Sequence, residues 1–200
     1  AAGILLDYSK NRIDDDVLSH LMALAEQQAL PESIAAMFAG DVLNNTEKRP
    51  VLHTALRQPR GASVKVNGQD VMPEVHATLD KMAQFCDQVH SGAFCGHTGK
   101  PLRTIVNIGI GGSFLGPKLV SDALMPYWQS GYDLRYMANI DGTDFAETVK
   151  GLDPETTLFV ICSKSFNTLE TLKNAEAARQ WFYEQGGTPE QVQQLSLIHI

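Results

Sequence analysis

The stretch at residues 160–171, VICSKSFNTLET, joins the end of an apolar run to the start of a helical pattern. Residues 157–162 predict a buried strand, and residues 169–184 carry apolar side chains at helical spacing. The hydroxyl-rich loop between them therefore lies where a strand meets a helix N-terminus. Free backbone N–H groups and the positive end of the helix dipole favour an anion at such a place. The stretch predicts a strand–loop–helix unit whose loop is a candidate anion-binding site.

Four side chains of this loop are candidates for binding the anion, and they are Ser163, Lys164, Ser165 and Thr168. The three hydroxyl groups can donate hydrogen bonds, and the lysine adds a positive charge. An alternative is that Asn167 and Glu170 form a capping box and that the hydroxyl groups only cap the helix. The N-x-x-E spacing fits this alternative, so the loop by itself leaves both interpretations open.

A second loop, GIGGSFLGP at residues 109–117, follows another apolar strand candidate at residues 102–110. A helical pattern follows at residues 118–124, and Pro117 fits the first turn of that helix. Two known phosphate-binding motifs do not match the sequence of this loop. The dinucleotide fingerprint needs glycine in place of Phe114, and the P-loop needs lysine in place of Pro117. The loop forms a second strand–loop–helix unit without a nucleotide-binding signature.

The two loops together resemble those of the glucose-6-phosphate isomerase family. Residues 107–117 are similar to the glycine loop of that family, and residues 163–171 to its Ser-Lys-Thr-Phe-Thr-Thr-x-Glu-Thr phosphate loop. Other segments are similar in the same order, at residues 8–12, 49–57, 70–75 and 139–143. The resemblance extends over almost the whole chain, to about Gln194.

The resemblance implies a sugar isomerase (SIS) domain, a three-layer α/β/α sandwich with a parallel sheet. It implies conversion of glucose 6-phosphate to fructose 6-phosphate through an enediolate, without a cofactor, in glycolysis and gluconeogenesis. The implied substrate-binding residues are Ser163, Lys164, Ser165 and Thr168 for the phosphate, with Gly112 and Ser113 beside the sugar. It also implies a homodimer for the full-length protein. The competing class is an SIS regulatory module that binds a phosphosugar without catalysis.

The chain departs from the family pattern at several positions. Ser165 and Asn167 stand where threonine is usual, and we expect phosphate binding to survive both changes. Phe114 replaces a polar or acidic residue, and Asp144 a common histidine; both concern local packing. Pro50 replaces a small residue and removes one backbone donor.

Family members are several hundred residues longer, so we expect this chain to be a fragment, cut at both ends and inactive alone. The glutamate, arginine, histidine and lysine that perform the family's chemistry lie in the absent half, and no catalytic residue is assigned here. We expect a helical segment at residues 1–50 and a truncated first SIS domain at residues 51–194. Residues 195–200 read as a non-native tail, with a divergent strand as the alternative, and His199 receives no function.

Composition argues against a nucleic-acid-binding, membrane or metal-binding protein. The net charge is −7 and the isoelectric point is near 5.3, with no basic run of the kind that binds nucleic acid. No apolar stretch of about 18 residues and no signal-peptide pattern occur, so we expect a cytoplasmic protein without a membrane partner. The three cysteines have no C-x-x-C spacing, and Cys95 with His97 cannot fill a metal site.

The periodicity predicts helices first and then alternating strands and helices. Early helices are expected at residues 14–28, 31–38 and 73–90, with Gly40 and Gly92 ending the last two. Strands at residues 102–110, 132–138 and 157–162 alternate with helices near residues 118–124, 144–151 and 169–184. Such alternation requires parallel strands, whose ligands lie beyond their carboxyl ends.

Overall fold

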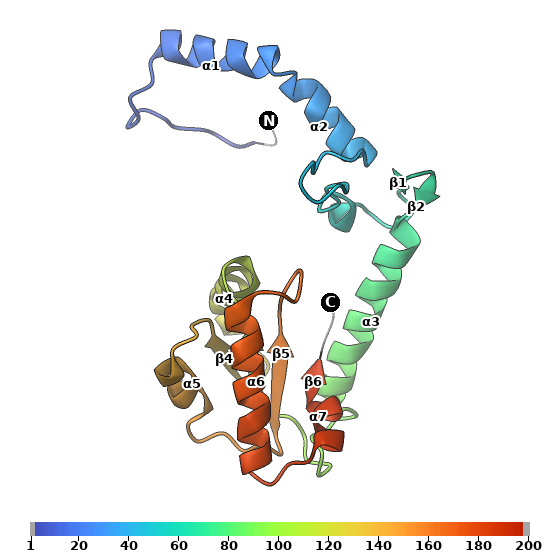
Figure 1. Ribbon diagram of the computed structural model, residues 1–200, viewed down its shortest axis with the longest axis vertical. Helices are drawn as coiled ribbons and strands as arrows, with labels where there is room; N and C mark the ends of the chain where they lie inside the picture. The colour runs from blue at the N-terminus through green and yellow to red at the C-terminus, as the bar shows by residue number, and fades with distance from the viewer. Residues whose placement is uncertain (1–2, 198–200) are drawn as a thin grey trace. The chain divides into compact units, whose positions relative to one another are not determined.

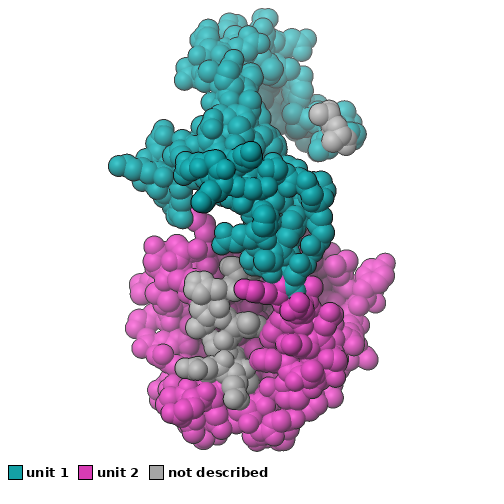
Figure 2. All heavy atoms as spheres, turned by 90° about the vertical axis from the view of Figure 1, so that its right-hand side faces the viewer, with its two compact units in different colours: residues 1–80 teal, residues 81–200 magenta. Residues whose placement is uncertain are grey.

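The computed structural model describes the backbone of residues 3–197 and the side chains of residues 3–192 (Figure 1). The chain divides into two compact units, Ala1–Asp80 and Lys81–Ile200, which Figure 2 distinguishes by colour. The boundary falls within helix α3 (Met72–Ser91), which the sequence predicted almost to the residue.

The first unit begins with the two predicted helices, α1 (Asp15–Gln27) and α2 (Leu30–Ala39). The Asp14 carboxylate caps α1 by accepting a hydrogen bond from the Val17 N–H at 2.9 Å. Gly40 ends α2 in the left-handed conformation, with φ of 86°. Both helices are therefore confirmed, with the start and stop residues that the sequence indicated.

A short hairpin in the first unit was not predicted. Strands β1 (Lys65–Val66) and β2 (Gln69–Asp70) pair antiparallel across Asn67-Gly68, and both turn residues have positive φ. Asn-Gly is the usual signal for such a turn. With two residues in each strand, the alternation of polar and apolar side chains is too short to detect. The hairpin follows the short helix η1 (Ala55–Arg57) and adjoins a small core of Ala55, Val64 and Met72.

The second unit is built on a parallel sheet with strand order β4-β3-β5-β6, in which β6 is the short strand Ser196–Leu197. The central strand β3 (Thr104–Ile108) lies between β4 (Asp133–Met137) and β5 (Thr157–Ile161). The three strands are in level register, since Ile108 pairs with both Met137 and Ile161. Their carboxyl ends therefore meet at one edge, which places the two candidate loops on neighbouring strands.

Helices cover both faces of this sheet, which confirms the predicted α/β/α sandwich (Figure 1). On one face, α3 and α4 (Gly112–Ala123) lie against the side chains of alternate strand residues such as Ile105 and Leu158. On the other face, α5 (Gly142–Val149) and α6 (Leu169–Glu184) pack over a fully buried core. This core contains Val106, Ile108, Met137, Phe159 and Ala178.

Two element boundaries correct the sequence analysis. Helix α4 begins at Gly112 rather than near residue 118, so Pro117 lies inside the helix and not in its first turn. The glycines at its start weakened the helical pattern, which hid the first turn. Helix α5 begins at Gly142, with Asp141 as its N-cap, two residues before the predicted start.

Three short elements of the second unit were not predicted: η2 (Met125–Tyr127), α7 (Pro189–Leu195) and β6 (Ser196–Leu197). Strand β6 pairs in parallel with Phe159 and Val160 of β5. Any short apolar run can form a pairing of two residues, so this pairing does not distinguish a divergent strand from a non-native tail. The non-native origin of residues 195–200 stays a prediction. His199 lies outside the described residues.

Candidate functional site

Helices α4 and α6 both begin at the carboxyl edge of the sheet, directly after the neighbouring strands β3 and β5. Their N-cap residues are Gly111 and Thr168, and neither makes a side-chain cap hydrogen bond. In α4 the N–H groups of Ser113 and Phe114 donate instead to the backbone carbonyls of Ile110 and Gly111, at 3.1 and 3.0 Å. Two such helix ends at one edge make a place for an anion.

The capping-box alternative for the loop at residues 163–168 is wrong. The N-cap of α6 is Thr168, one residue after Asn167. The amide oxygen of Asn167 accepts a hydrogen bond from the Ser165 hydroxyl instead of one from the helix backbone. The side chains of this loop are therefore not committed to capping the helix.

A hydrogen bond between a backbone N–H and a side chain of the same loop stabilises the loop at residues 163–168. The Ser163 hydroxyl oxygen accepts a hydrogen bond from the Phe166 N–H at 3.1 Å, and Phe166 has a φ of 52°. An accepting hydroxyl keeps its proton, so Ser163 can still donate to a ligand. Lys164 and Ser165 are exposed, whereas Ser163 and Thr168 are half-buried.

Three of the predicted site residues line one hollow of about 550 Å³, which we call the loop hollow. Ser113, Ser163 and Lys164 contribute to its wall, and most of the remaining wall is apolar and comes from α3, β3 and β5. Gly112, Ser165 and Thr168 do not line it, although they lie next to these residues in the chain. The structure thus brings the two loops to a common space on the α3 and α4 face.

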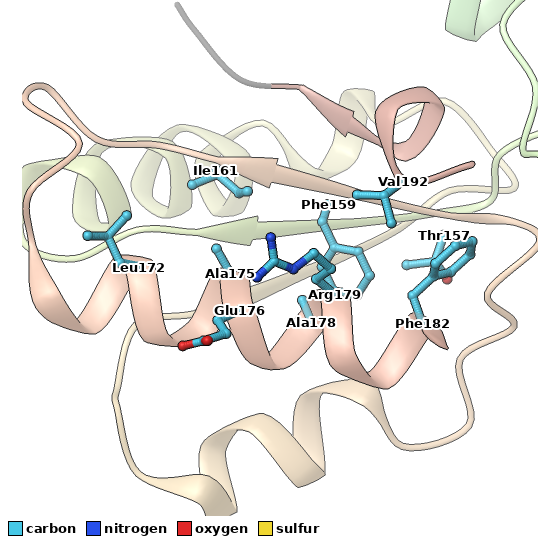
Figure 3. A pocket seen from close by; sticks show the side chains of 10 residues that line it. All are labelled: Thr157, Phe159, Ile161, Leu172, Ala175, Glu176, Ala178, Arg179, Phe182 and Val192. Atoms are coloured by element: carbon cyan, nitrogen blue, oxygen red, sulfur yellow. The ribbon is translucent and has the colours of Figure 1, made fainter. Parts of the chain in front are cut away.

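A second hollow, of about 350 Å³, lies on the opposite face between β5, α6 and α7. Figure 3 shows side chains of α6, such as Leu172 and Ala175, opposite Phe159 and Ile161 of β5. No predicted site residue lines this hollow. Its wall is mostly apolar, and the charged side chains that it includes, Arg179 and Glu176, are of opposite sign. Since the loop hollow holds three of the predicted residues, we place the candidate site there.

The neighbouring loop after β4 is fixed by its own carboxylates. Asp144 accepts hydrogen bonds from the N–H groups of Ala138 and Asn139, at 3.2 and 3.0 Å. Asp141 accepts one from the Thr143 N–H at 2.7 Å, and this backbone bond lowers the pKa of the Asp141 carboxyl. Asp144, which stands where the family often has histidine, thus bonds to the backbone of its own loop.

Sequence reasoning did not assign a role to two buried polar residues beside the site. Asn107, on β3, is 8% exposed, and its side chain bonds to both loops. Thr171, in the first turn of α6, is 2% exposed, and its hydroxyl has no hydrogen-bond partner among the described residues. The position of Asn107 inside an apolar strand is visible in the sequence, but the partners of its amide are known only from the folded structure.

Other classes of site find no support in the part of the chain that the structure describes. Within residues 3–192, whose side chains the structure describes, no three His, Cys, Asp or Glu residues are grouped to hold a metal ion. The described helices also include none with the length and apolar character needed to cross a bilayer.

An open parallel sheet with helices that begin at its carboxyl edge defines an α/β protein, a class whose ligands lie at that edge. The model of the phosphoglucose isomerase family matches residues 7–198, so the chain belongs to this family.

Named relatives agree with this family. The chain is 55% identical over 192 residues to a glucose-6-phosphate isomerase of Pseudomonas aeruginosa strain LESB58, covering 96% of this chain and 35% of the relative. It is 56% identical over 185 residues to a glucose-6-phosphate isomerase of Nitrosospira multiformis, and this match covers 92% of this chain and 34% of the relative. The chain spans about a third of the length of the curated relatives it matches.

A crystal structure of a glucose-6-phosphate isomerase from Chlamydia trachomatis is also similar, with a TM-score of 0.72 and 32% identity. The match covers 91% of this chain and 35% of that chain. The predicted fold is therefore shared with a solved structure of the family.

Proposed function

We propose that this chain is the phosphate-binding part of a glucose-6-phosphate isomerase, which interconverts glucose 6-phosphate and fructose 6-phosphate. Family membership over residues 7–198 and the names of the relatives support the activity. The observation that carries the phosphate role is the pair of uncapped helix ends, α4 and α6, beside the loop hollow. Similarity to named isomerases over 96% of the chain favours an enzyme over a non-catalytic phosphosugar module.

Each candidate residue has a role in this proposal. The hydroxyl groups of Ser113 and Ser163 donate to phosphate oxygens, and Lys164 supplies the positive charge. Ser165 and Thr168 add hydroxyl groups at the start of α6. Gly112 has open space where a Cβ would stand, which leaves room for the ligand against the backbone of α4.

Phosphate binding serves a reaction that takes place elsewhere on the sugar. The proton moves between C2 and C1 through an enediolate, while the phosphate orients the substrate and supplies remote binding energy. We assign no acid or base for this step to the chain, and we expect it to be inactive alone in a coupled isomerase assay. No cofactor is required, and the pathway is glycolysis or gluconeogenesis. Family membership also supports a cytoplasmic homodimer for the longer protein.

The test is an NMR titration of the 200-residue chain with glucose 6-phosphate, with unphosphorylated glucose and NAD as controls. We expect amide shifts at residues 111–113 and 163–168 with the phosphosugar alone. Lys164→Ala should weaken binding about tenfold or more, since hydrogen bonds to charged groups contribute roughly 1.5–3 kcal/mol. Lys173→Ala is the matched control, because Lys173 pairs with Glu176 on the outside of α6. Equal losses in both variants, or shifts with glucose, would contradict the proposal.

A further inference from the structure

We infer that Asn107 is a positioning residue whose side-chain amide holds the two phosphate loops at a fixed distance from each other. This inference rests on the proposed phosphate binding and names a residue that touches both loops and no ligand. Asn107 lies one residue before the end of β3, and its side chain is on the α3 and α4 face of the sheet. The loop hollow opens on the same face.

The first contact of Asn107 satisfies a carbonyl that the helix leaves unpaired. Pro117 has no N–H, so within α4 the carbonyl of Ser113, four residues earlier, receives no helical hydrogen bond. The Asn107 Nδ2 group donates to this Ser113 oxygen at 3.2 Å. The amide of Asn107 therefore takes the place of the missing backbone donor and fixes the residue whose hydroxyl faces the site.

The second contact reaches the other loop. The Cys162 thiol donates to the Asn107 Oδ1 atom, with 3.1 Å between sulfur and oxygen. Cys162 directly precedes Ser163, and its N–H donates to the Ile108 carbonyl at 2.8 Å. Burial raises the pKa of the Cys162 thiol, which keeps its proton in place for this bond. Asn107 is thus linked to the residue that begins the phosphate loop of β5.

The chemistry of these two contacts requires an amide. A carbonyl oxygen can only accept, so the nitrogen of Asn107 must face Ser113 and its oxygen must face Cys162. Leucine has a similar size and lacks both groups, aspartate lacks the donor, and glutamine is one methylene too long. Since Asn107 is more than nine-tenths buried, water cannot replace either contact without a change in packing.

The matched control is Asn174, a second buried amide of the same unit. It is 5% exposed, and its Nδ2 group donates to the Asn139 carbonyl at 2.8 Å, which ties α6 to the loop after β4. Asn174→Leu removes a buried amide hydrogen bond of the same kind without touching either phosphate loop. A general loss of stability would therefore affect both variants alike.

The experiment records amide spectra of the 200-residue chain and its affinity for inorganic phosphate and glucose 6-phosphate. In Asn107→Leu we expect shifts at both Ser113 and residues 163–168 without ligand, and about tenfold weaker phosphate binding. In Asn174→Leu the shifts should lie near Asn139, with affinity within about twofold of the wild type. Ligand-free spectra in which Asn107→Leu moves one loop alone, or an equal loss of affinity in both variants, would overturn the inference.

A second pair of variants tests the coupling if Asn107→Leu does not fold. Cys162→Ala removes the donor to Asn107, while Cys162→Ser keeps one. The Ser113 amide, in the other loop, should shift in the alanine variant and return toward its wild-type position in the serine variant. An unchanged Ser113 amide in both refutes the coupling. Absence of phosphate binding by the wild-type chain refutes the proposed function instead, and the ligand-free shifts still decide the role of Asn107.

Discussion

Replacing Gly109 by alanine tests how closely the sheet edge and the Ser113 loop are packed. A Cβ built on Gly109 would lie 2.6 Å from the Ser113 carbonyl oxygen and 3.0 Å from both the carbonyl carbon and the Cβ of Ser113. An ordinary contact is at least 3.4 Å, so the oxygen must move by about 0.8 Å. The obstacle is backbone, which cannot rotate away as a flexible side chain can. Overpacking of this kind costs about 1–3 kcal/mol of folding free energy.

The same shift should affect ligand binding more than stability alone predicts. It moves the acceptor of the Asn107 bond and the hydroxyl of Ser113 together, and a hydrogen bond to a charged group contributes roughly 1.5–3 kcal/mol to binding. Urea unfolding and phosphate titration measure the two effects. Gly116→Ala is the control, because its Cβ meets nothing and alanine is favoured over glycine inside α4 by about 1 kcal/mol. A Gly109→Ala variant as stable and as tight-binding as the wild type would refute the packing argument.

Three other predictions concern stability and its pH dependence. Leu158→Ala, at a side chain only 1% exposed, should cost about 2–5 kcal/mol in denaturant unfolding. Leu119→Ala, at 70% exposure, should cost less than about 0.5 kcal/mol, and equal losses would contradict the core assignment. Pro117→Ala should supply a helical N–H donor to the Ser113 carbonyl. Asn107→Leu should therefore destabilise the Pro117→Ala variant less than it destabilises the wild type. Strictly additive unfolding free energies would refute this. Burial raises the pKa of Cys162 above its ordinary value of 9.0, so the folded chain holds this proton more tightly than the unfolded chain. This stabilisation is complete below about pH 8 and lost as pH rises through the raised pKa, so Cys162→Ser should flatten the alkaline decline in stability. Cys86→Ser, at an exposed thiol, should leave the decline unchanged.

The sequence predicted the strands of the parallel sheet and α6 well because their periodicity is a direct consequence of burial. Strands β3, β4 and β5 each place alternate side chains on two covered faces, and residues 169–184 form α6 as predicted. The prediction failed where the local pattern is short or atypical. The hairpin at β1 and β2 has too few residues for a period, and the glycines at the start of α4 resemble a loop.

The candidate site was predicted in part for a related reason. Ser163 and Lys164 were identifiable because the loop lies between a strand and a helix N-terminus and resembles the phosphate loop of the family, and the structure places both at one hollow with Ser113. Their binding role remains a prediction. Asn107 could not be assigned from the sequence, because its function depends on the partners that its amide meets. Those partners are Ser113 and Cys162, which are brought together only when β3 and β5 pair.

Three locally unfavourable backbone features lie where the anion is proposed to bind. A glycine N-cap without a side-chain bond, a proline inside α4 and a left-handed Phe166 each carry a cost that an isolated segment would not bear. Asn107 offsets one of them by pairing with the Ser113 carbonyl, and Ser163 stabilises the turn at Phe166. The N-cap residues of α4 and α6 make no side-chain cap hydrogen bond among the described residues, and in α4 the N–H groups of Ser113 and Phe114 bond to backbone carbonyls. The anion proposed above would add a partner for N–H groups at the start of both helices.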